Sequence, residues 1–335
     1  MSEVLLSSGT RSALGDFGGS LKEVEFTDLA SQVARACIEK SGASPSAIDH
    51  IVFTTTCPTD RDSLFSARVV GMKSGLPEEA AALDVSRACA SGLQAIISAG
   101  QQIQTGQSQL ALAAGAEMFS RAPYAVTTSR WGNPRGTQQL EDLLEWCYRC
   151  PFSLEYMGDT AENLADKYQY ERAPMDDYAV SSQMRALAAI ESGFLSKQIV
   201  PVRVPEGRSN RDFDTDESPR EGITTERLAR LRPAFQEGGK VTAGNSSGVT
   251  DGAGAILVGT LASMEKNGVI PEARVVDWTV VGVPPSLMGH GPVPAIEKLL
   301  ARTGLTVPEI AYFEVNEAFA VVNLHVEAQL GIPRD

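Results

Sequence analysis

The segment from residue 81 to residue 104 constrains the fold of this chain more than any other. Residues 81–85 are mostly apolar and predict a short buried strand, while residues 91–104 carry apolar side chains at helical spacing. Only a few residues separate the two, so the chain must pass from strand to helix through a sharp elbow. Similar strand-like and helix-like runs alternate elsewhere and predict an α/β architecture.

Cys89 lies on this elbow. The N-terminal end of a helix carries unpaired N–H groups and partial positive charge, which favour a thiolate over a thiol. The small residues Ser91 and Gly92 leave room for a substrate carbonyl to approach the sulfur. A buried cysteine that packs as a small hydrophobe is the alternative interpretation. The position on an elbow favours a nucleophile.

Composition and charge exclude several classes of protein. With 335 residues and 43% hydrophobic content, the chain can bury a large core in two domains or in one duplicated domain. The net charge of −13 argues against binding to nucleic acid or to anionic membranes. No apolar stretch is long enough to cross a bilayer. The N-terminal segment resembles neither a signal peptide nor a presequence, and the five cysteines are odd in number, so we expect reduced thiols and a cytoplasmic location.

Cys147 and Cys150 form an isolated Cys-Tyr-Arg-Cys motif. A zinc site would need a second cysteine pair or histidines at suitable spacing, so no metal site is predicted. A redox pair is one interpretation of the motif. Two separate thiols in a pocket or in the core are the favoured one.

The composition and the pattern of expected strands and helices divide the chain into three parts. Residues 1–118 alternate in βα fashion, with a helix expected over 27–40 and strands over 50–55 and 109–114. Residues 119–248 are richer in aromatic, proline and charged residues and are expected to form an inserted domain. Helices are expected in it near 160–168 and 175–193. The apolar βα pattern resumes over 249–335, which we expect to form a second, incomplete core half.

A weak internal repeat links the two core halves. Residues 42–53 resemble residues 304–315, and each stretch is expected to leave a helix, turn and enter a strand. A site between two such α/β copies would lie beyond the carboxyl ends of strands. In the second copy the sequence stops soon after Pro333, so we expect the counterpart of the Cys89 elbow to lie outside it.

Ordered motifs along nearly the whole chain resemble the thiolase family. These motifs are Cys89-Ala-Ser-Gly-Leu-Gln-Ala, Met157-Gly-Asp-Thr-Ala-Glu-Asn163, Thr242-Ala-Gly-Asn-Ser-Ser-Gly248, Gly291-Pro-Val-Pro-Ala295 and Asn316-Glu-Ala-Phe-Ala320. The resemblance implies a duplicated five-layer αβαβα core, with an inserted loop domain that holds coenzyme A. It also implies a homo-oligomer, either a dimer or a tetramer.

The resemblance implies an activity and catalytic residues. The reaction is thiolytic cleavage of 3-oxoacyl-CoA, or the reverse Claisen condensation of acyl-CoA, with the acyl group carried on Cys89. Asn316 matches the asparagine that positions a water in the oxyanion site, where the thioester oxygen needs fixed donors. A strand-end or capping role is the alternative for Asn316. CoA and acyl-CoA are substrates, and no permanently bound cofactor is implied.

Binding residues follow from the same resemblance. Ser247, with Ala243 and Gly244, matches a run along the pantetheine arm, where small residues let the backbone approach the ligand. Arg220 matches an arginine beside the adenine end of CoA, and a solvated surface charge is its alternative. Met157, Ala318 and Phe319 match pocket positions, although Met157 and Phe319 would also suit an ordinary core.

Two family motifs are missing from this sequence. One is a Gly-His-Pro histidine that activates the nucleophile, and the other is a second cysteine that carries the substrate proton. The histidines present, His50, His290 and His325, are poor substitutes. We therefore expect either an incomplete sequence, a remainder supplied by another polypeptide, or very slow turnover by a chain that ends at Asp335.

The sequence leaves the acyl chain length and two alternative functions open. Tyr156 stands where thiolases that make acetoacetyl-CoA commonly have histidine, which leaves the acyl chain length open. A non-catalytic thiolase-like protein that binds acyl-CoA or lipid, or an inactive fragment, is the main alternative to an enzyme. A 3-oxoacyl synthase is a weaker one. Cys89 and Asn316 together favour the enzyme, because a pure binding protein needs no thiolate.

Overall fold

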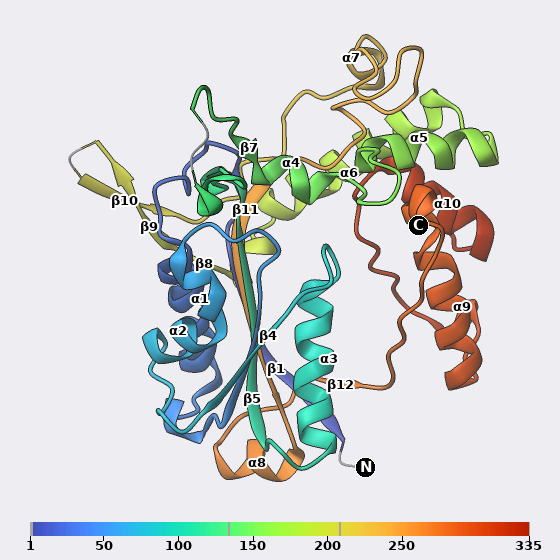
Figure 1. Ribbon diagram of the computed structural model, residues 1–335. Helices are drawn as coiled ribbons and strands as arrows, with labels where there is room; N and C mark the ends of the chain where they lie inside the picture. The colour runs from blue at the N-terminus through green and yellow to red at the C-terminus, as the bar shows by residue number, and fades with distance from the viewer. Residues whose placement is uncertain (1–2, 133–134, 208, 335) are drawn as a thin grey trace. The chain divides into compact units, whose positions relative to one another are not determined.

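The computed structural model describes residues 3–132, 135–207 and 209–334. The chain forms two compact units, each assembled from three separate stretches (Figure 1). Unit 1 comprises Met1–Cys147, Gly193–Ser218 and Val249–Val275, and unit 2 comprises Tyr148–Ser192, Pro219–Gly248 and Val276–Asp335. Neither unit coincides with one of the three segments expected from the sequence, and that three-part division stays a prediction.

A mixed sheet forms the centre of unit 1. Its strands lie in the order β12 (Ala273–Val275), β1 (Val4–Ser12), β11 (Thr250–Gly259), β5 (Leu110–Met118), β3 (His50–Thr54) and β4 (Ala81–Val85). The first four are antiparallel neighbours, whereas β5, β3 and β4 run parallel. Two short strands, β2 (Gly15–Asp16) and β8 (Ile199–Val200), pair with β11 and β1. The predicted α/β class and the strands expected near residues 50, 81 and 109 are confirmed.

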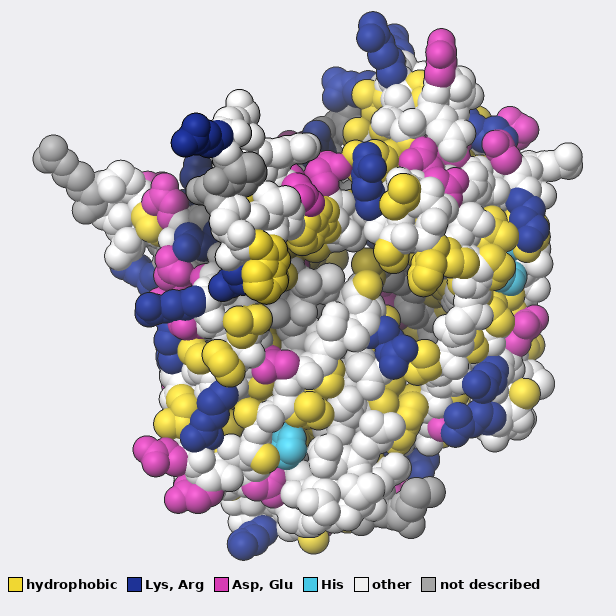
Figure 2. Space-filling model, viewed as in Figure 1, with side chains coloured by type: hydrophobic (Ala, Val, Ile, Leu, Met, Phe, Trp, Pro, Cys, Tyr) yellow, Lys and Arg dark blue, Asp and Glu magenta, His cyan; other side chains and the backbone are white. Residues whose placement is uncertain are grey.

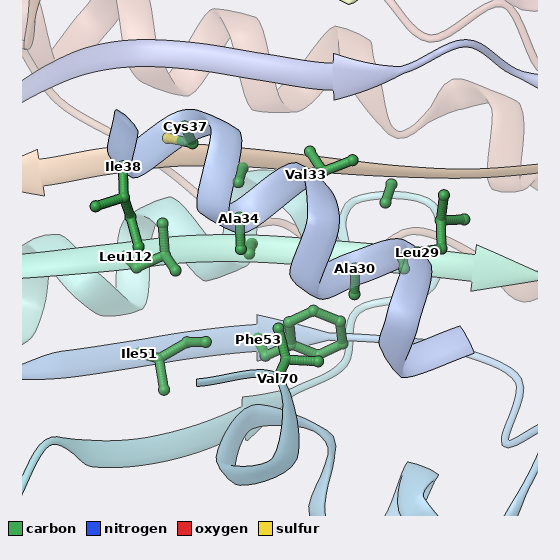
Figure 3. Packing of buried hydrophobic residues seen from close by; sticks show 14 of the residues in the cluster. Leu29, Ala30, Val33, Ala34, Cys37, Ile38, Ile51, Phe53, Val70 and Leu112 are labelled. Atoms are coloured by element: carbon green, nitrogen blue, oxygen red, sulfur yellow. The ribbon is translucent and has the colours of Figure 1, made fainter. Parts of the chain in front are cut away.

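Helices cover both faces of this sheet. Figure 1 shows α1 (Phe26–Ser41) and α2 (Ser66–Lys73) on one side of the strands and α3 (Ser91–Gln104) on the other. Side chains of a strand alternate between faces, so Leu112 of β5 packs in the cluster under α1, while Ala111 packs in the cluster under α3. Figure 3 shows the apolar side of α1 against these strands. The rings of Phe26 and Phe53 meet edge to face with centroids 5.8 Å apart.

Residues 81–85 form the expected strand, but the expectation that this strand is buried is wrong. β4 does form over Ala81–Val85, but four of its five residues are exposed. Its backbone pairs with β3 alone among the described residues, so it is an edge strand. An apolar run indicates a strand but does not indicate whether neighbours cover both of its sides.

Smaller elements complete unit 1. Strands β9 and β10 form a hairpin, and β6 and β7 form a second short ladder. The remaining elements are β6 (Tyr124–Ala125), β7 (Glu141–Asp142), α4 (Leu143–Tyr148), β9 (Val202–Glu206), β10 (Ser209–Phe213) and α8 (Leu261–Lys266).

Unit 2 is helical in its described residues, where no strand is assigned. Its helices are α5 (Met157–Tyr168), α6 (Arg172–Glu191), α7 (Thr225–Leu228), α9 (Pro292–Thr303) and α10 (Ala320–Leu330). The helices expected near 160–168 and 175–193 are therefore confirmed, with starts about three residues earlier. One apolar cluster packs α5, α6 and α10 together, and it includes Leu164 of α5, Met175 of α6 and Val321 of α10.

The helix end and the turn of the internal repeat are present in both copies, but the strand is present only in the first. Gly42 and Gly304 end α1 and α9 in the left-handed conformation, with φ of 75° and 72°. A single 3-10 turn follows each, closed by the N–H of Ile48 or Ile310. β3 follows the first turn, but no strand follows the second. A strand needs hydrogen-bonding neighbours, and no described part of unit 2 supplies one at 311–315.

Charged side chains of both signs are spread over the face of the molecule drawn in Figure 2. Figure 2 shows Lys and Arg side chains interspersed with Asp and Glu on the face drawn. Among the helices of the described residues, none is both long and apolar enough to cross a membrane.

Candidate active site

The elbow predicted at Cys89 is present in unit 1. β4 ends at Val85 and α3 begins at Ser91, and the thiol of Cys89 between them is exposed. The N–H of Ala90 donates to the carbonyl of Arg87, and the N–H of Ser91 donates to that of Ala88, each at 3.0 Å. These two bonds fold the chain back within three residues, which holds Cys89 at the tip of the turn.

The first turn of α3 is fixed by its own side chains. The hydroxyl of Ser91 accepts the N–H of Arg87 at 2.7 Å, and the guanidinium of Arg87 donates to Gln94 at 2.8 Å. The N–H groups of Gly92 and Leu93 lie in the first turn of α3, where a helix offers no carbonyl to accept them. A side chain added at Gly92 would meet nothing within 4 Å. The space beside Gly92 is therefore open.

The residue before the nucleophile has a strained backbone. Ala88 has φ of 45°, in the left-handed region that residues with a Cβ avoid. Such a conformation costs on the order of 1 kcal/mol and persists only where the surroundings impose it. The strain marks the Cys89 elbow as a constrained site.

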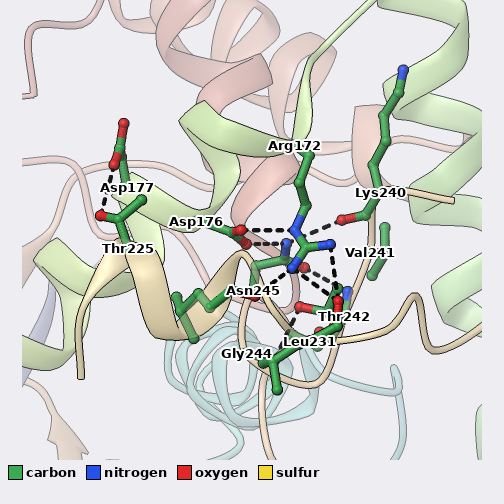
Figure 4. Close-up of polar contacts among 12 residues, drawn as sticks. Arg172, Asp176, Asp177, Thr225, Leu231, Lys240, Val241, Thr242, Gly244 and Asn245 are labelled. Atoms are coloured by element: carbon green, nitrogen blue, oxygen red, sulfur yellow. Dashed lines mark hydrogen bonds and ion pairs between the residues drawn. The ribbon is translucent and has the colours of Figure 1, made fainter. Parts of the chain in front are cut away.

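In unit 2, buried carboxylates hold the loop over residues 240–247. The carboxylate of Glu162 accepts the backbone N–H groups of Lys240, at 2.8 Å, and of Val241, at 2.7 Å. Asp176 accepts the side-chain N–H of Asn245 at 2.8 Å with one oxygen and the guanidinium of Arg172 at 2.7 Å with the other. Figure 4 shows Arg172 and Asp176 of α6 pointing toward Asn245 of the loop. Both carboxylates are buried and have their hydrogen bonds satisfied.

The same loop pairs with the segment over residues 318–320. The N–H of Ser247 donates to the carbonyl of Ala318, and the N–H of Ala320 donates to the carbonyl of Asn245, each at 2.9 Å. Ser246 and Phe319 form an antiparallel bridge between these two bonds. The structure therefore brings Ser247, Ala318 and Phe319 together, although they are far apart in sequence.

Apolar contacts complete this site. Met157 and Ala318 pack against the cluster that contains Phe319, which is only 8% exposed. The ring of Phe235 meets that of Phe319 edge to face at 6.2 Å and also lies where a Cβ at Gly158 would project. Met157, Ala318 and Phe319 thus belong to one apolar cluster.

The small residues of the loop differ in their surroundings. Ala243 and Ser247 are exposed, as a contact with a ligand requires. Gly244 is half-buried, and a Cβ there would collide with Leu228 and Leu231. The absence of a side chain at Gly244 thus serves the packing of α7 and the residues after it.

Asn316 is exposed, and its neighbour Glu317 is anchored to α6. The carboxylate of Glu317 accepts the hydroxyl of Tyr178 at 2.8 Å and the hydroxyl of Ser182 at 2.6 Å. Burial and the adjacent Glu317 carboxylate raise the pKa of the Tyr178 phenol. Glu317 belongs to the Asn-Glu-Ala-Phe motif, but nothing in the motif predicts its partners on α6.

Arg220 occupies a different part of unit 2. Its side chain is exposed, and its N–H donates to the side chain of Gln183 on α6 at 2.8 Å. It is therefore anchored to α6 rather than to the Ser247 loop.

Two of the three histidines contact each other in unit 2, and the third is buried in unit 1. In unit 2, His290 Nδ1 and His325 Nε2 share a hydrogen bond at 2.9 Å, and the Tyr170 hydroxyl contacts His325 Nδ1 at 3.2 Å. Burial, with the charges of His290 and Lys167, lowers the pKa of His325 to about 4. In unit 1, burial lowers the pKa of His50 on β3.

Proteins of known name and known structure are similar to this chain. The chain matches the N-terminal domain of thiolase over residues 4–261 and the C-terminal domain of thiolase over residues 269–335. It is 41% identical to a beta-ketothiolase of Cupriavidus necator, over 98% of this chain and 84% of that protein. It is 39% identical to the mitochondrial 3-ketoacyl-CoA thiolase of Bos taurus, over 98% of this chain and 83% of that protein.

Solved structures agree with these matches. The acetyl-CoA acetyltransferase of Bacillus anthracis superposes with a TM-score of 0.96 at 38% identity, covering 100% of this chain and 84% of that one. Human mitochondrial 3-ketoacyl-CoA thiolase in complex with CoA superposes with a TM-score of 0.95 at 37% identity, covering 99% of this chain and 83% of that one. The chain therefore belongs to the thiolase family of acyltransferases.

Proposed function

We propose that this chain transfers acyl groups between 3-oxoacyl-CoA and CoA through a thioester on Cys89. The exposed thiol of Cys89 on a strained strand-to-helix elbow is the observation that carries the proposal. A nucleophile needs exposure and a fixed direction of approach, and this elbow supplies both. The relatives named 3-ketoacyl-CoA thiolase and acetyl-CoA acetyltransferase support the reaction class.

The chemistry runs in two halves. The thiolate of Cys89 attacks the 3-oxo carbon, and the bond between C2 and C3 of the substrate breaks, releasing the enolate of acetyl-CoA, which takes up a proton. The thiol of a second CoA then attacks the acyl group on Cys89 and carries it away, which restores the cysteine. In both halves negative charge develops on a thioester oxygen. We assign Asn316 to position a water that donates to that oxygen.

Coenzyme A is proposed to bind as a substrate. The solved human relative is in complex with CoA. Three of the residues that the family resemblance assigns to CoA lie on one loop of unit 2. Ser247 and Ala243 are exposed and can contact the pantetheine arm, and Gly244 lies between them. Arg220 is exposed and can stack on or pair with the adenine nucleotide end. Met157, Ala318 and Phe319 would line the pocket.

The finer architecture is proposed from the same resemblance. It is a duplicated five-layer αβαβα core in halves over 1–118 and 249–335, with an inserted CoA-binding domain over 119–248. The matching cap and turn at Gly42 and Gly304 support a duplication. We further propose a homo-oligomer, a dimer or a tetramer, in the cytoplasm.

Tyr156 bears on the choice of acyl chain. It precedes α5, and the guanidinium of Arg149 lies over its ring at 4.4 Å and donates to its hydroxyl at 2.9 Å. Histidine at this position is typical of enzymes that make acetoacetyl-CoA. We therefore propose short or medium 3-oxoacyl-CoA substrates rather than acetoacetyl-CoA alone.

Acetylation of the protein tests this function. Incubation with acetyl-CoA, followed by mass spectrometry of the intact chain, should show one acetyl group, mapped by peptide analysis to Cys89. Cys89→Ala should lose the adduct and lower turnover by on the order of a thousandfold or more. Cys37→Ala is the matched control, because Cys37 is buried in the core and cannot take up substrate.

Two outcomes would contradict the covalent mechanism. One is the absence of an adduct on folded protein, and the other is an adduct that persists in Cys89→Ala. CoA binding in a titration without any adduct or turnover would instead support a binding protein.

A further inference from the structure

Two hydroxyl groups of α6 hold the carboxylate of Glu317, the residue that follows Asn316. One carboxylate oxygen accepts the hydroxyl of Tyr178 at 2.8 Å, and the other accepts the hydroxyl of Ser182 at 2.6 Å. Tyr178 and Ser182 are four residues apart on one helix, so they project from the same face. Both oxygens of one carboxylate are therefore bound to one element, which fixes the side chain in position and in orientation.

The Tyr178 side chain is itself held in place. Its ring packs against the apolar cluster that contains Met175 and Phe319, and the guanidinium of Arg334 lies 5.2 Å from the centre of the ring. Burial and the hydrogen bond to Glu317 raise the pKa of the Tyr178 phenol, so it stays protonated at neutral pH. Its hydroxyl is thus a fixed donor.

The backbone that leads to Asn316 has little other support. Residues 312–317 adopt no regular secondary structure, and in the described part of the chain residues 312–316 make no hydrogen bond between backbone groups. On the other side of Glu317, Ala318 and Ala320 pair with the loop that contains Ser247. Among the described contacts, the bonds from α6 to Glu317 are therefore the attachment nearest to Asn316 along the chain.

The role proposed for Asn316 requires such an attachment. Asn316 is exposed, so packing does not fix it. A group that stabilises developing charge has to be in place before the reaction begins, because it then needs no reorganisation in the transition state. A misplacement of about 1 Å is enough to cost about a hundredfold in rate.

We propose that Glu317, Tyr178 and Ser182 are positioning residues for the oxyanion site at Asn316. α6 holds Glu317 through two hydrogen bonds, and Glu317 fixes the backbone of Asn316, whose side chain then holds its water in one place. This inference rests on the proposed function, because it gives the three residues a part in the same reaction. The same helix anchors the Ser247 loop, so one element supports both the oxyanion site and the CoA site.

Ser182→Ala tests the role with the smallest change. It removes one bond to Glu317, so kcat should fall by about five- to tenfold while the KM for CoA stays at the wild-type value. Ser182→Thr keeps the hydroxyl and should restore kcat. Ser181→Ala makes the same change at the adjacent residue, which lines an open groove with Met184, and should leave kcat unchanged. An unchanged kcat in Ser182→Ala, or a rise in KM alone, would overturn the proposal.

A double-mutant cycle tests whether Ser182 acts through Glu317. Glu317→Ala removes both hydrogen bonds to α6 and should lower kcat by about fiftyfold. The addition of Ser182→Ala to this variant should cost nothing more, because the serine then has no carboxylate to hold. If Ser182→Ala instead lowers kcat by the same factor with and without Glu317, the serine acts elsewhere and the proposal is wrong.

NMR relaxation of the whole protein tests the positioning without turnover. The order parameter of the Asn316 backbone N–H should be about 0.85 in the wild-type protein and in Ser181→Ala, lower in Ser182→Ala, and below about 0.6 in Glu317→Ala. Equal values in all four proteins would refute the positioning role. The two proposals also fail differently. A wild-type protein without an acetyl adduct on Cys89 contradicts the proposed function, whereas an adduct with unchanged kcat and order parameter in Ser182→Ala contradicts this inference alone.

Discussion

At the scale of single residues, the elbow around Cys89 combines exposure with backbone strain. The thiol is exposed, and Ala88 before it has φ of 45°. The sequence predicted the elbow, because an apolar strand-like run and a helical run leave only a few residues for the turn. It did not predict the strain, since alanine is an unfavourable residue for the left-handed conformation.

Glycine at two neighbouring positions should have opposite effects. Ala88→Gly should raise the free energy of unfolding by about 0.5–1 kcal/mol, because glycine adopts the left-handed backbone without strain. Ala90→Gly should lower it by a similar amount, because Ala90 has φ of −89° and gains nothing from glycine. Thermal unfolding of the two variants measures the difference. A stabilisation by both, or by neither, would show that Ala88 is not strained.

At the scale of elements, α6 organises the candidate binding site through side chains on adjacent turns. Asp176 holds Arg172 and Asn245, and Tyr178 with Ser182 holds Glu317. The sequence predicted α6 itself from its pattern. It could not predict these partners, because Asp176 and Asn245 are 69 residues apart and nothing in the local pattern joins them.

Adjacent aspartates on α6 should differ sharply in their effect on stability. The Asp176 side chain is buried, and its removal leaves Arg172 with carbonyl acceptors only and takes one of the two acceptors of the Asn245 amide, so Asp176→Ala should cost about 3–5 kcal/mol. Asp177 is exposed and accepts the hydroxyl of Thr225 at 3.0 Å, so Asp177→Ala should cost less than about 1 kcal/mol. Urea unfolding measures both values. Equal losses would contradict the anchoring role of Asp176.

The Tyr178 anchor should affect turnover more than binding. Tyr178→Phe removes one of the hydrogen bonds to Glu317 and loosens the backbone beside Asn316, so kcat should fall by about tenfold while the KM for CoA stays unchanged. Tyr312→Phe makes the same change at a tyrosine that is 92% exposed and should leave kcat at the wild-type value. A rise in KM with an unchanged kcat would argue against a positioning role.

At the scale of the whole molecule, the buried His325 should make the protein sensitive to acid. Its pKa is about 4 in the folded state and near 6.5 when unfolded. The unfolded state therefore binds more protons between these values, and stability is full above pH 6.5 and falls as the pH drops toward 4. Between pH 7.5 and pH 5 this loss amounts to about 2 kcal/mol.

A variant isolates the contribution of His325. His325→Asn should be less stable at pH 7.5, because it loses the contacts with His290 and Tyr170, but its stability should fall less on acidification. Glu117 and Asp251 have a pKa raised by burial and act with the opposite sign, but they are present in both proteins and cancel. Unfolding midpoints at the two pH values give the comparison. Parallel pH profiles would show that His325 does not govern the response.

Local patterns in the sequence predict the features that depend on neighbouring residues along the chain, such as helices and their ends. Helical spacing placed α3 over residues 91–104, and Gly42 and Gly304 marked the ends of α1 and α9, because periodicity and caps are local properties. The order of the sequence motifs along the chain indicated the thiolase family. Only the tertiary structure decided which strand is an edge and whether residues 311–315 form one, since both depend on hydrogen-bonding partners.

The partners of individual side chains were also decided by the tertiary structure. The Ser247 loop meets residues 318–320 across a long stretch of chain, and Glu317 meets Tyr178 of α6 across another. Packing brings such residues together only after distant elements have docked. No pattern within a window of the sequence contains that information, because the contact energy depends on distance in space and not on separation along the chain.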